Sequence, residues 1–193
     1  MFEKYVENEL TRKIAIVNLL WENVQLTSID LAISLDVTAT TIKSDIKSIN
    51  LYYCSVNEPL IVSETTGYSI LNKKSQDKRS YLKRIYSDSL FIRACCFYLK
   101  HNFSNAGKLA DEEFISVSKA YELKRKVIEY VEGLGIKVAD KTIANTECRL
   151  RFLITFFQMK VGIDFISISK YNKYQFSKLF DKIEEVENCL LSE

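Results

Sequence analysis

The clearest feature of the apolar pattern is a pair of short helices in residues 27–50, joined by a tight turn. Apolar residues recur at helical spacing in both segments, as expected for helices that each bury one face. The inward positions are Ile29, Leu31, Ala32 and Leu35 in the first helix and Ile42, Ile46 and Ile49 in the second. Only Asp36 and Val37 lie between the helices, and Thr38 stands where its side chain can cap the second. The pattern therefore predicts a helix-turn-helix.

The outward side of the second predicted helix carries small, polar and basic side chains. Near the start of the helix these positions are Ala39, Thr40, Lys43, Ser44 and Lys47. A helix that lies in the major groove of DNA needs such residues, because bulky acidic side chains would be repelled by phosphate. The alternative is a three-helix core module whose polar face is only solvated.

The segments on either side extend this motif. A helix is predicted over residues 11–24, and its inner side would be formed by Ile14, Val17, Leu20 and Trp21. Two short strands, 60–63 and 68–71, flank a turn at residues 64–67. Three helices closed by a β-hairpin make a winged helix.

A second copy of the same pattern follows. Residues 106–115 predict a short helix, and Ser116 stands in the place of Thr38, 116 − 38 = 78 residues later. The remaining elements of this copy are a helix from Val117 onward, ended by Gly133 and Gly135, and strands 136–139 and 142–144. The inward positions of the helix are Ala120, Val127, Val131 and Leu134. The chain is thus predicted to contain an internal repeat.

Further helices complete the predicted fold. One long helix should follow the basic segment 73–84 and end near His101, and two others cover residues 146–160 and 174–191. The last helix either packs on its own domain or pairs with a second copy of the chain in a homodimer. The predicted fold class is mostly α, with tandem winged helix-turn-helix domains with short β-hairpin wings at 1–72 and 73–145 and a C-terminal helical segment at 146–193.

Charge is segregated along the chain, although the net charge is only +2. Residues 72–84 contain six cations and one acid, whereas residues 181–193 contain five acids and one cation. Such separation is typical of a protein that presents one face to a polyanion and keeps another away from it.

The composition argues against several other classes of protein. No stretch approaches the ~20 apolar residues of a membrane span, and the N-terminus lacks a secretory signal, so we expect a cytoplasmic protein with no membrane partner. The five cysteines show no CxxC spacing and His101 is the only histidine, so neither a metal site nor a disulfide framework is predicted. We find no phosphate-binding glycine motif and no histidine near a nucleophile, and predict neither an enzyme nor a cofactor.

Three stretches carry a resemblance to a known family. They are LAISLDVTATTIKSDIKSIN at 31–50, KLADEEFISVS at 108–118 and TIANTECRLRFLITFF at 142–157. The first resembles the leading helix-turn-helix of Mga-type regulators, the M-protein trans-acting positive regulators of Gram-positive bacteria. The other two resemble the start and end of the next domain in that family. Asn145, Glu147 and Arg151 resemble its glycine, glutamate and arginine pattern, with Asn145 at the usual glycine position.

The resemblance covers about residues 11–157 and implies tandem winged helices that act in transcription. Family members typically continue into phosphotransferase-regulated domains and a transporter-like C-terminal domain. This sequence holds neither, so we expect either a short regulator or a fragment of a longer one. Control by histidine phosphorylation is not carried over from the family.

Both second helices of the repeat are expected to contact double-stranded DNA. Lysine and arginine side chains would mainly bind phosphate, whereas hydroxyl groups could reach base edges. The candidate phosphate contacts are Lys43, Lys47, Lys119, Lys124 and Arg125, together with Lys73 and Lys74 of the basic segment. The candidate base contacts are Thr40, Thr41, Ser44 and Ser118. Because both helices contain little Arg, Asn or Gln, we predict weak base readout and more dependence on DNA shape.

Two other functions are compatible with the same predicted fold. A plasmid or phage replication or partition factor would bind repeated sites near an origin. A protein-interaction module would use the winged helices without DNA, which suits the acidic C-terminal residues. Binding through several DNA phosphates must weaken steeply as salt rises, and this dependence separates the DNA-binding functions from the interaction module.

Overall fold

The computed structural model describes residues 2–54, 59–75, 77–101, 103–139 and 142–144, and positions 151, 153–155, 157 and 161. The chain divides into two compact units, Met1–Ile163 and Asp164–Glu193, and the second lies wholly outside the described residues. The described part is mostly helical and contains two separate two-stranded antiparallel sheets. The predicted helix at 174–191 and most of that at 146–160 lie outside the described residues, and the proposed domain boundaries stay predictions.

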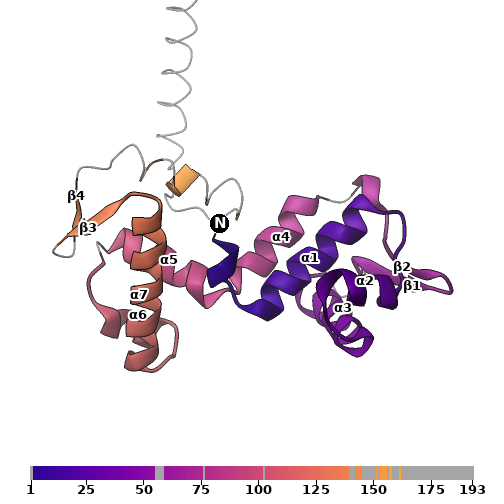
Figure 1. The fold of residues 1–193 in the computed structure, drawn as a ribbon, viewed down its shortest axis with the longest axis horizontal. Helices are drawn as coiled ribbons and strands as arrows, with labels where there is room; N and C mark the ends of the chain where they lie inside the picture. Colours follow the sequence, from indigo (N-terminus) through magenta and orange to yellow (C-terminus); the bar gives the residue numbers. More distant parts are fainter. Residues whose placement is uncertain are drawn as a thin grey trace, which may run out of the picture. The chain divides into compact units, whose positions relative to one another are not determined.

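The first region consists of three helices followed by a hairpin (Figure 1). A short 3-10 helix, η1 (Glu3–Tyr5), precedes them, and the elements are α1 (Asn8–Glu22), α2 (Ser28–Leu35), α3 (Ala39–Tyr53), β1 (Ile61–Glu64) and β2 (Gly67–Ile70). Both α1 and α2 pack against α3, and the hairpin closes the region beside α1 and α3. The core side chains include Ile16, Val17, Leu20, Leu31, Ile42, Ile49 and Leu60.

The hairpin is tied to the segment between α1 and α2. Leu26 exchanges two backbone hydrogen bonds with Tyr68, of 3.1 Å and 2.8 Å, so this segment adds one bridge beside β2. Gly67 has φ +142°, and a Cβ at this position would lie 2.7 Å from the Leu26 carbonyl oxygen. Only glycine permits both this backbone conformation and so close an approach of the two chains.

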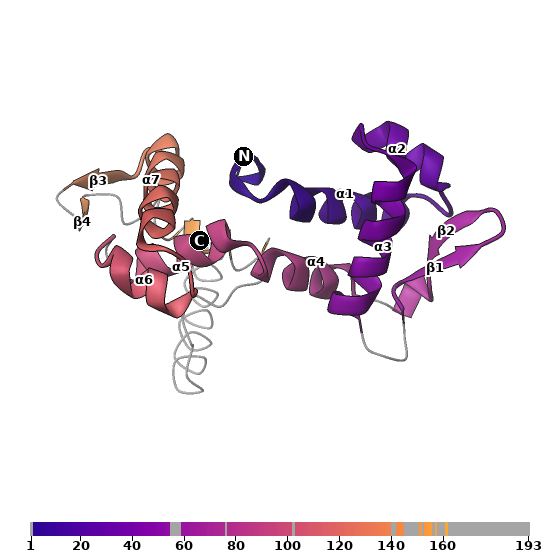
Figure 2. The same cartoon turned by 90° about the horizontal axis from the view of Figure 1, so that it is seen from below.

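The prediction of a single long helix after the basic segment was wrong. The structure has a 3-10 turn, η2 (Lys73–Ser75), and two helices, α4 (Lys78–Ser87) and α5 (Leu90–Lys100), which meet at Asp88 and Ser89. The buried Ser89 side chain accepts a hydrogen bond from the Ile92 N–H and starts a new helix. Arg93 donates 3.0 Å hydrogen bonds to the carbonyl oxygens of Ser87 and Asp88, which stabilises the break. Figure 2 shows α4 alongside α1.

The second region repeats the order of the first. Its first helix is α5, followed by α6 (Ala106–Glu112), α7 (Val117–Gly133), β3 (Lys137–Ala139) and β4 (Thr142–Ala144). Both α5 and α6 pack against α7, and β3 pairs with β4 as predicted. The Tyr98 hydroxyl, from α5, donates a buried 3.0 Å hydrogen bond to the Ala120 carbonyl oxygen in α7.

Four predicted core positions differ from the structure, and one of them, Leu35, is half-buried. Ile29 is 62% exposed, because a 3.6-residue period puts it about 200° around α2 from the buried Leu31. Trp21 and Leu134 are half-buried rather than fully buried, and the Trp21 ring lies 6.5 Å from that of Tyr81.

Among the described helices, none is long and apolar enough to cross a membrane.

Candidate nucleic-acid interface

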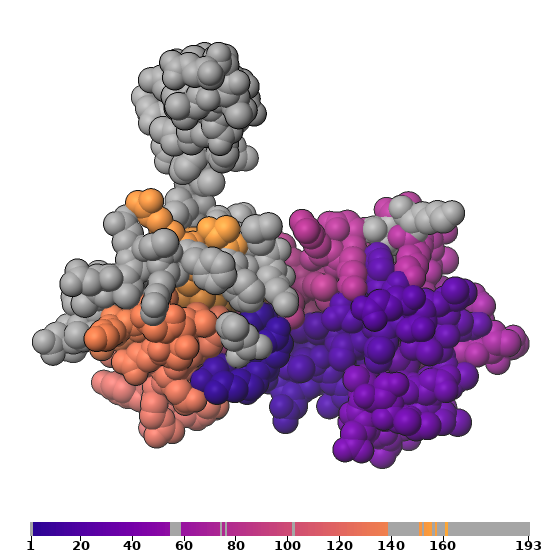
Figure 3. Space-filling view, turned by 45° about the horizontal axis from the view of Figure 1, so that its top comes forward, coloured from indigo at the N-terminus to yellow at the C-terminus, as the bar shows by residue number. Residues whose placement is uncertain are grey.

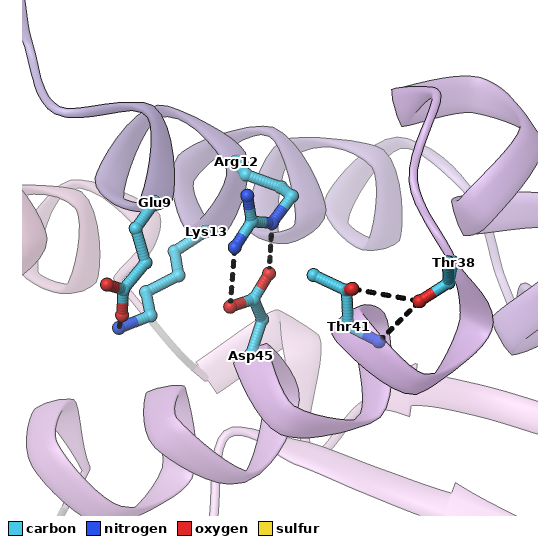
Figure 4. Close-up of polar contacts among 6 residues, drawn as sticks. All are labelled: Glu9, Arg12, Lys13, Thr38, Thr41 and Asp45. Carbon is cyan, nitrogen blue, oxygen red and sulfur yellow. Dashed lines mark hydrogen bonds and ion pairs between the residues drawn. The ribbon is translucent and has the colours of Figure 1, made fainter.

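The turn between α2 and α3 has the geometry that the sequence predicted. Asp36 adopts a left-handed conformation with φ 52°, and the Val37 N–H donates a 3.0 Å hydrogen bond to the Ala32 carbonyl oxygen. Thr38 then caps α3, because its hydroxyl oxygen accepts a 3.2 Å hydrogen bond from the Thr41 N–H (Figure 4). Three residues, Asp36, Val37 and Thr38, therefore connect the two helices.

The outward face of α3 contains four of the predicted contact residues. Thr40, Lys43, Ser44 and Lys47 are exposed. Neither lysine forms an ion pair with any residue that the structure describes. Thr41 differs, because it is half-buried and its hydroxyl lies 2.9 Å from that of Thr38 within the cap. In the space-filling view, the violet surface of the first three helices is continuous, with the magenta hairpin at its edge (Figure 3).

The one acidic residue of α3 points away from this face. Asp45 is 5% exposed, and its carboxylate accepts hydrogen bonds from Nε and Nη2 of Arg12 in α1 (Figure 4). This hydrogen bond raises the pKa of Arg12. Because the only negative charge of the helix is buried against a guanidinium, the exposed side keeps an uncompensated positive charge.

The last turn of α3 is anchored to neighbouring elements. Tyr53, in its last turn, donates a 2.6 Å hydrogen bond to Asp88, and Arg84 donates a 2.8 Å hydrogen bond to the Tyr53 carbonyl oxygen. Burial raises the pKa of the Tyr53 hydroxyl, so the hydroxyl stays a donor. Close by, the buried Lys13 ammonium lies 2.6 Å from Glu9 and lowers the pKa of that carboxyl group (Figure 4). The contacts of Tyr53 hold the end of α3 in place while the outward face of the helix stays open.

Lys73, at the start of the basic segment, is less open than its charge suggests. Lys73 lies in η2 and is half-buried, with its ammonium 3.5 Å from the Asn23 carbonyl oxygen. Lys74 lies in the same turn, but its side chain is outside the described part of the structure. This pair stays a predicted phosphate contact.

The turn before α7 repeats the backbone geometry of the turn before α3. Phe114 has φ 53°, and the Ile115 N–H donates a 3.0 Å hydrogen bond to the Ala110 carbonyl oxygen. The Ser116 hydroxyl oxygen caps α7 by accepting a 3.2 Å hydrogen bond from the Lys119 N–H. Each of these positions lies 78 residues after its counterpart in the first region. The predicted alignment of Ser116 with Thr38 is therefore confirmed at the level of individual hydrogen bonds.

The side chains of α7, however, compensate one another's charge. Glu122 lies 2.8 Å from the Lys126 ammonium and 3.0 Å from that of Lys119. Hydrogen bonds from Lys126 and then Lys119 lower the pKa of Glu122 to about 2. Two of the four cations near the start of α7 are thus paired on its own surface.

The other predicted residues of α7 separate into two groups. Lys124 is half-buried, with its ammonium 6.0 Å from the Tyr98 ring centroid, so it is not fully outward-facing. Ser118 and Arg125 are exposed, and Arg125 forms no ion pair with the described residues. The structure therefore brings only Ser118 and Arg125 fully onto the face that corresponds to the outward face of α3.

Sequence analysis missed the Arg12–Asp45 pair and the spacing of charges around Glu122. Asp45 lies between Ile42 and Ile46 on the inward stripe of α3, and an acid in such a place requires a partner. The Glu122 pairs follow i,i+3 and i,i+4 spacing, which is readable from sequence. No protein-family model matches this chain, and no curated protein matches it, so the resemblance to Mga-type regulators stays a prediction from the quoted residues.

Proposed function

We propose that this protein binds double-stranded DNA through α3 and regulates transcription in the manner of the Mga-type regulators that its sequence resembles. The supporting observation is the outward face of α3, where Lys43 and Lys47 are exposed while Asp45 is buried against Arg12. A helix with this charge distribution attracts phosphate along its open side. Cytoplasmic DNA would be its partner, and no cofactor is invoked.

The arrangement around α3 supports a winged helix. Three helices precede a hairpin, and the Leu26 bridge adds the short strand-like segment between the first and second helices. In this interpretation, α3 is the recognition helix and the β1–β2 hairpin is the wing. At the wing tip, Glu64 accepts a 3.3 Å hydrogen bond from Gln25, so a carboxylate there would disfavour close contact with phosphate.

The contacts would divide between phosphate and base edges. Lys43 and Lys47 would hold the backbone, and Thr40 and Ser44 would face the bases. Thr41 would serve mainly as part of the cap. In α7, Arg125 and Ser118 would give a weaker second contact, because Lys119 and Lys126 already pair with Glu122.

A salt titration tests the proposal. Wild-type protein and Lys43→Gln/Lys47→Gln would be titrated against a fluorescent duplex of about 40 base pairs, roughly four helical turns, in random sequence and from upstream of the protein's own gene. We expect steeply salt-sensitive binding by the wild type. The variant should bind at least about tenfold more weakly, with a salt slope lower by about 2.

The matched control is Lys100→Gln/Lys137→Gln, which removes the same charge from exposed positions of the second region. This control should retain most of the wild-type affinity. Equal weakening of binding in both variants would mean that the affinity for DNA depends only on the net charge of the protein. An absence of binding at low salt would exclude the proposed function.

A further inference from the structure

The second region exposes large apolar side chains at positions where the first region has charged or small ones. Among the described residues, Phe114, Val117 and Tyr121 are 95%, 53% and 60% exposed and lie within eight positions of one another. Their counterparts 78 residues earlier are Asp36, Ala39 and Lys43. The same backbone therefore presents three large apolar side chains where the first region has an acid, an alanine and a lysine.

This surface is large enough to bind a partner. Aromatic side chains present about 150–250 Å² each, so the three exposed residues offer roughly 400 Å² of apolar area. On monomeric proteins, patches of about 300–600 Å² are often functional. In a symmetric dimer the patch would face a second copy of its own cations, so a second copy of the chain is a poor occupant.

The charges around the patch determine which partner fits. From Lys119 to Lys126, α7 carries four cations and a single acid, Glu122. Arg125 continues the i,i+4 stripe of Val117 and Tyr121, is exposed, and pairs with no described residue. An acidic segment with apolar anchors would match both the patch and this cation. Nucleic acid fits less well, because Glu122 stands where α3 has Ser44 and neutralises two of the cations.

We propose that the α6–α7 turn and the first three turns of α7 bind an acidic protein segment with apolar anchors. We call this surface, formed by Phe114, Val117, Tyr121 and Arg125, the α7 patch. Phe114 and Tyr121 are the apolar contacts, and Arg125 pairs with a carboxylate of the partner. This interaction does not depend on DNA binding by α3.

The test uses the full chain and a fluorescein-labelled amphipathic peptide of about four helical turns, with leucine on one face and glutamate on the other. Its controls are the same peptide with lysine in place of glutamate and with serine in place of leucine. The protein variant is Phe114→Asn/Tyr121→Gln, since asparagine tolerates the left-handed conformation of Phe114. The matched variant is Ile29→Gln/Ile33→Gln, which removes two exposed apolar residues from α2.

We expect the wild type to bind only the acidic amphipathic peptide. Phe114→Asn/Tyr121→Gln and Arg125→Glu should each weaken that binding by at least about tenfold, whereas Ile29→Gln/Ile33→Gln should not. All variants should unfold at the wild-type temperature, because the replaced side chains are exposed. Absence of peptide binding, or equal binding by the patch variant, would overturn the proposal. The proposal would also be overturned if the wild type formed a dimer, or bound single-stranded DNA, and the patch variant lost that property.

Discussion

The two regions have the same order of elements and the same turn geometry, yet their exposed surfaces differ in chemistry. At positions 78 residues apart, the outward residues are Thr40 and Ser118, Lys43 and Tyr121, Ser44 and Glu122, and Lys47 and Arg125. The backbone of the turn requires only a left-handed residue and a capping hydroxyl. The outward side chains are exposed or half-buried, so the turn geometry does not fix their chemistry.

The interiors of the two regions also differ. An ion pair between Arg12 and Asp45 joins the first helix to the third in one region. In the other, the Tyr98 hydroxyl and the Ala120 carbonyl oxygen make the corresponding link without charge. A charged link is costly to break on one side only, because the remaining ion stays partly buried.

The largest expected effect follows from breaking that ion pair. Asp45→Ala leaves Arg12, whose side chain is 22% exposed, without its carboxylate partner and should lower the free energy of unfolding by about 3 kcal/mol. Urea denaturation measures the change. In a double-mutant cycle, Arg12→Ala/Asp45→Ala should lose less than the sum of the single changes. A loss below about 1 kcal/mol in Asp45→Ala would show that the pair does not anchor α3.

The two capping residues should have similar, smaller effects. Thr38→Ala and Ser116→Ala each remove one side-chain acceptor for a backbone N–H, at a cost of about 1 kcal/mol. Thermal unfolding of each variant checks this equivalence. Replacement by glycine is the control, because it should cost only a few tenths of a kcal/mol. A much larger loss at one site would mean that the two turns are not equivalent.

Replacing Glu122 of α7 by serine, the residue at the equivalent position of α3, should strengthen DNA binding by α7. Glu122→Ser releases Lys119 and Lys126 from their ion pairs and should strengthen duplex binding by about threefold at low salt. Fluorescence anisotropy with the duplex used for α3 measures the change. Glu132→Ser removes the same charge from an exposed position near the end of α7 and serves as the control. Identical gains in affinity for both variants would mean that only the net charge of the protein matters.

Removing three of the four cations of α7 should change the affinity for duplex DNA only slightly. Lys119→Ala/Lys124→Ala/Arg125→Ala should weaken duplex binding by less than about threefold, since Lys119 is already paired and Lys124 is half-buried. The comparison is with Lys43→Gln/Lys47→Gln. If the α7 triple variant lost as much affinity as the α3 variant, the second region would have to be a full DNA-binding partner.

The smallest effect concerns pH. The pKa of Glu122 is lowered from its ordinary value of 4.5 to about 2, so its ion pairs are present above pH 4.5 and are lost as pH falls toward 2. The pairs are screened by solvent, and their loss should barely change the unfolding temperature. NMR titration of the Glu122 carboxyl carbon measures the pKa. A midpoint near 4.5 would show that the lysines do not pair with it in solution.

Local sequence determined the features that depend on neighbouring residues. The hydroxyls of Thr38 and Ser116, the short turns and the stripe of Ile42, Ile46 and Ile49 were all predicted, because helix caps and helical periodicity act within a few positions. The two hairpins were predicted within one residue of their observed ends. The charge spacing around Glu122 was equally local and could have been recognised.

The tertiary structure decided what depends on residues far apart in the chain. Arg12 and Asp45 are 33 positions apart, and only the packing of α1 on α3 shows that the acid is turned inward. The approach of Leu26 to Gly67 and the placement of Lys124 beside Tyr98 arise in the same way. Burial and pairing are set by neighbours that folding brings together. The sequence therefore predicted where α3 and α7 begin, and only the fold showed which of them keeps its positive charge open.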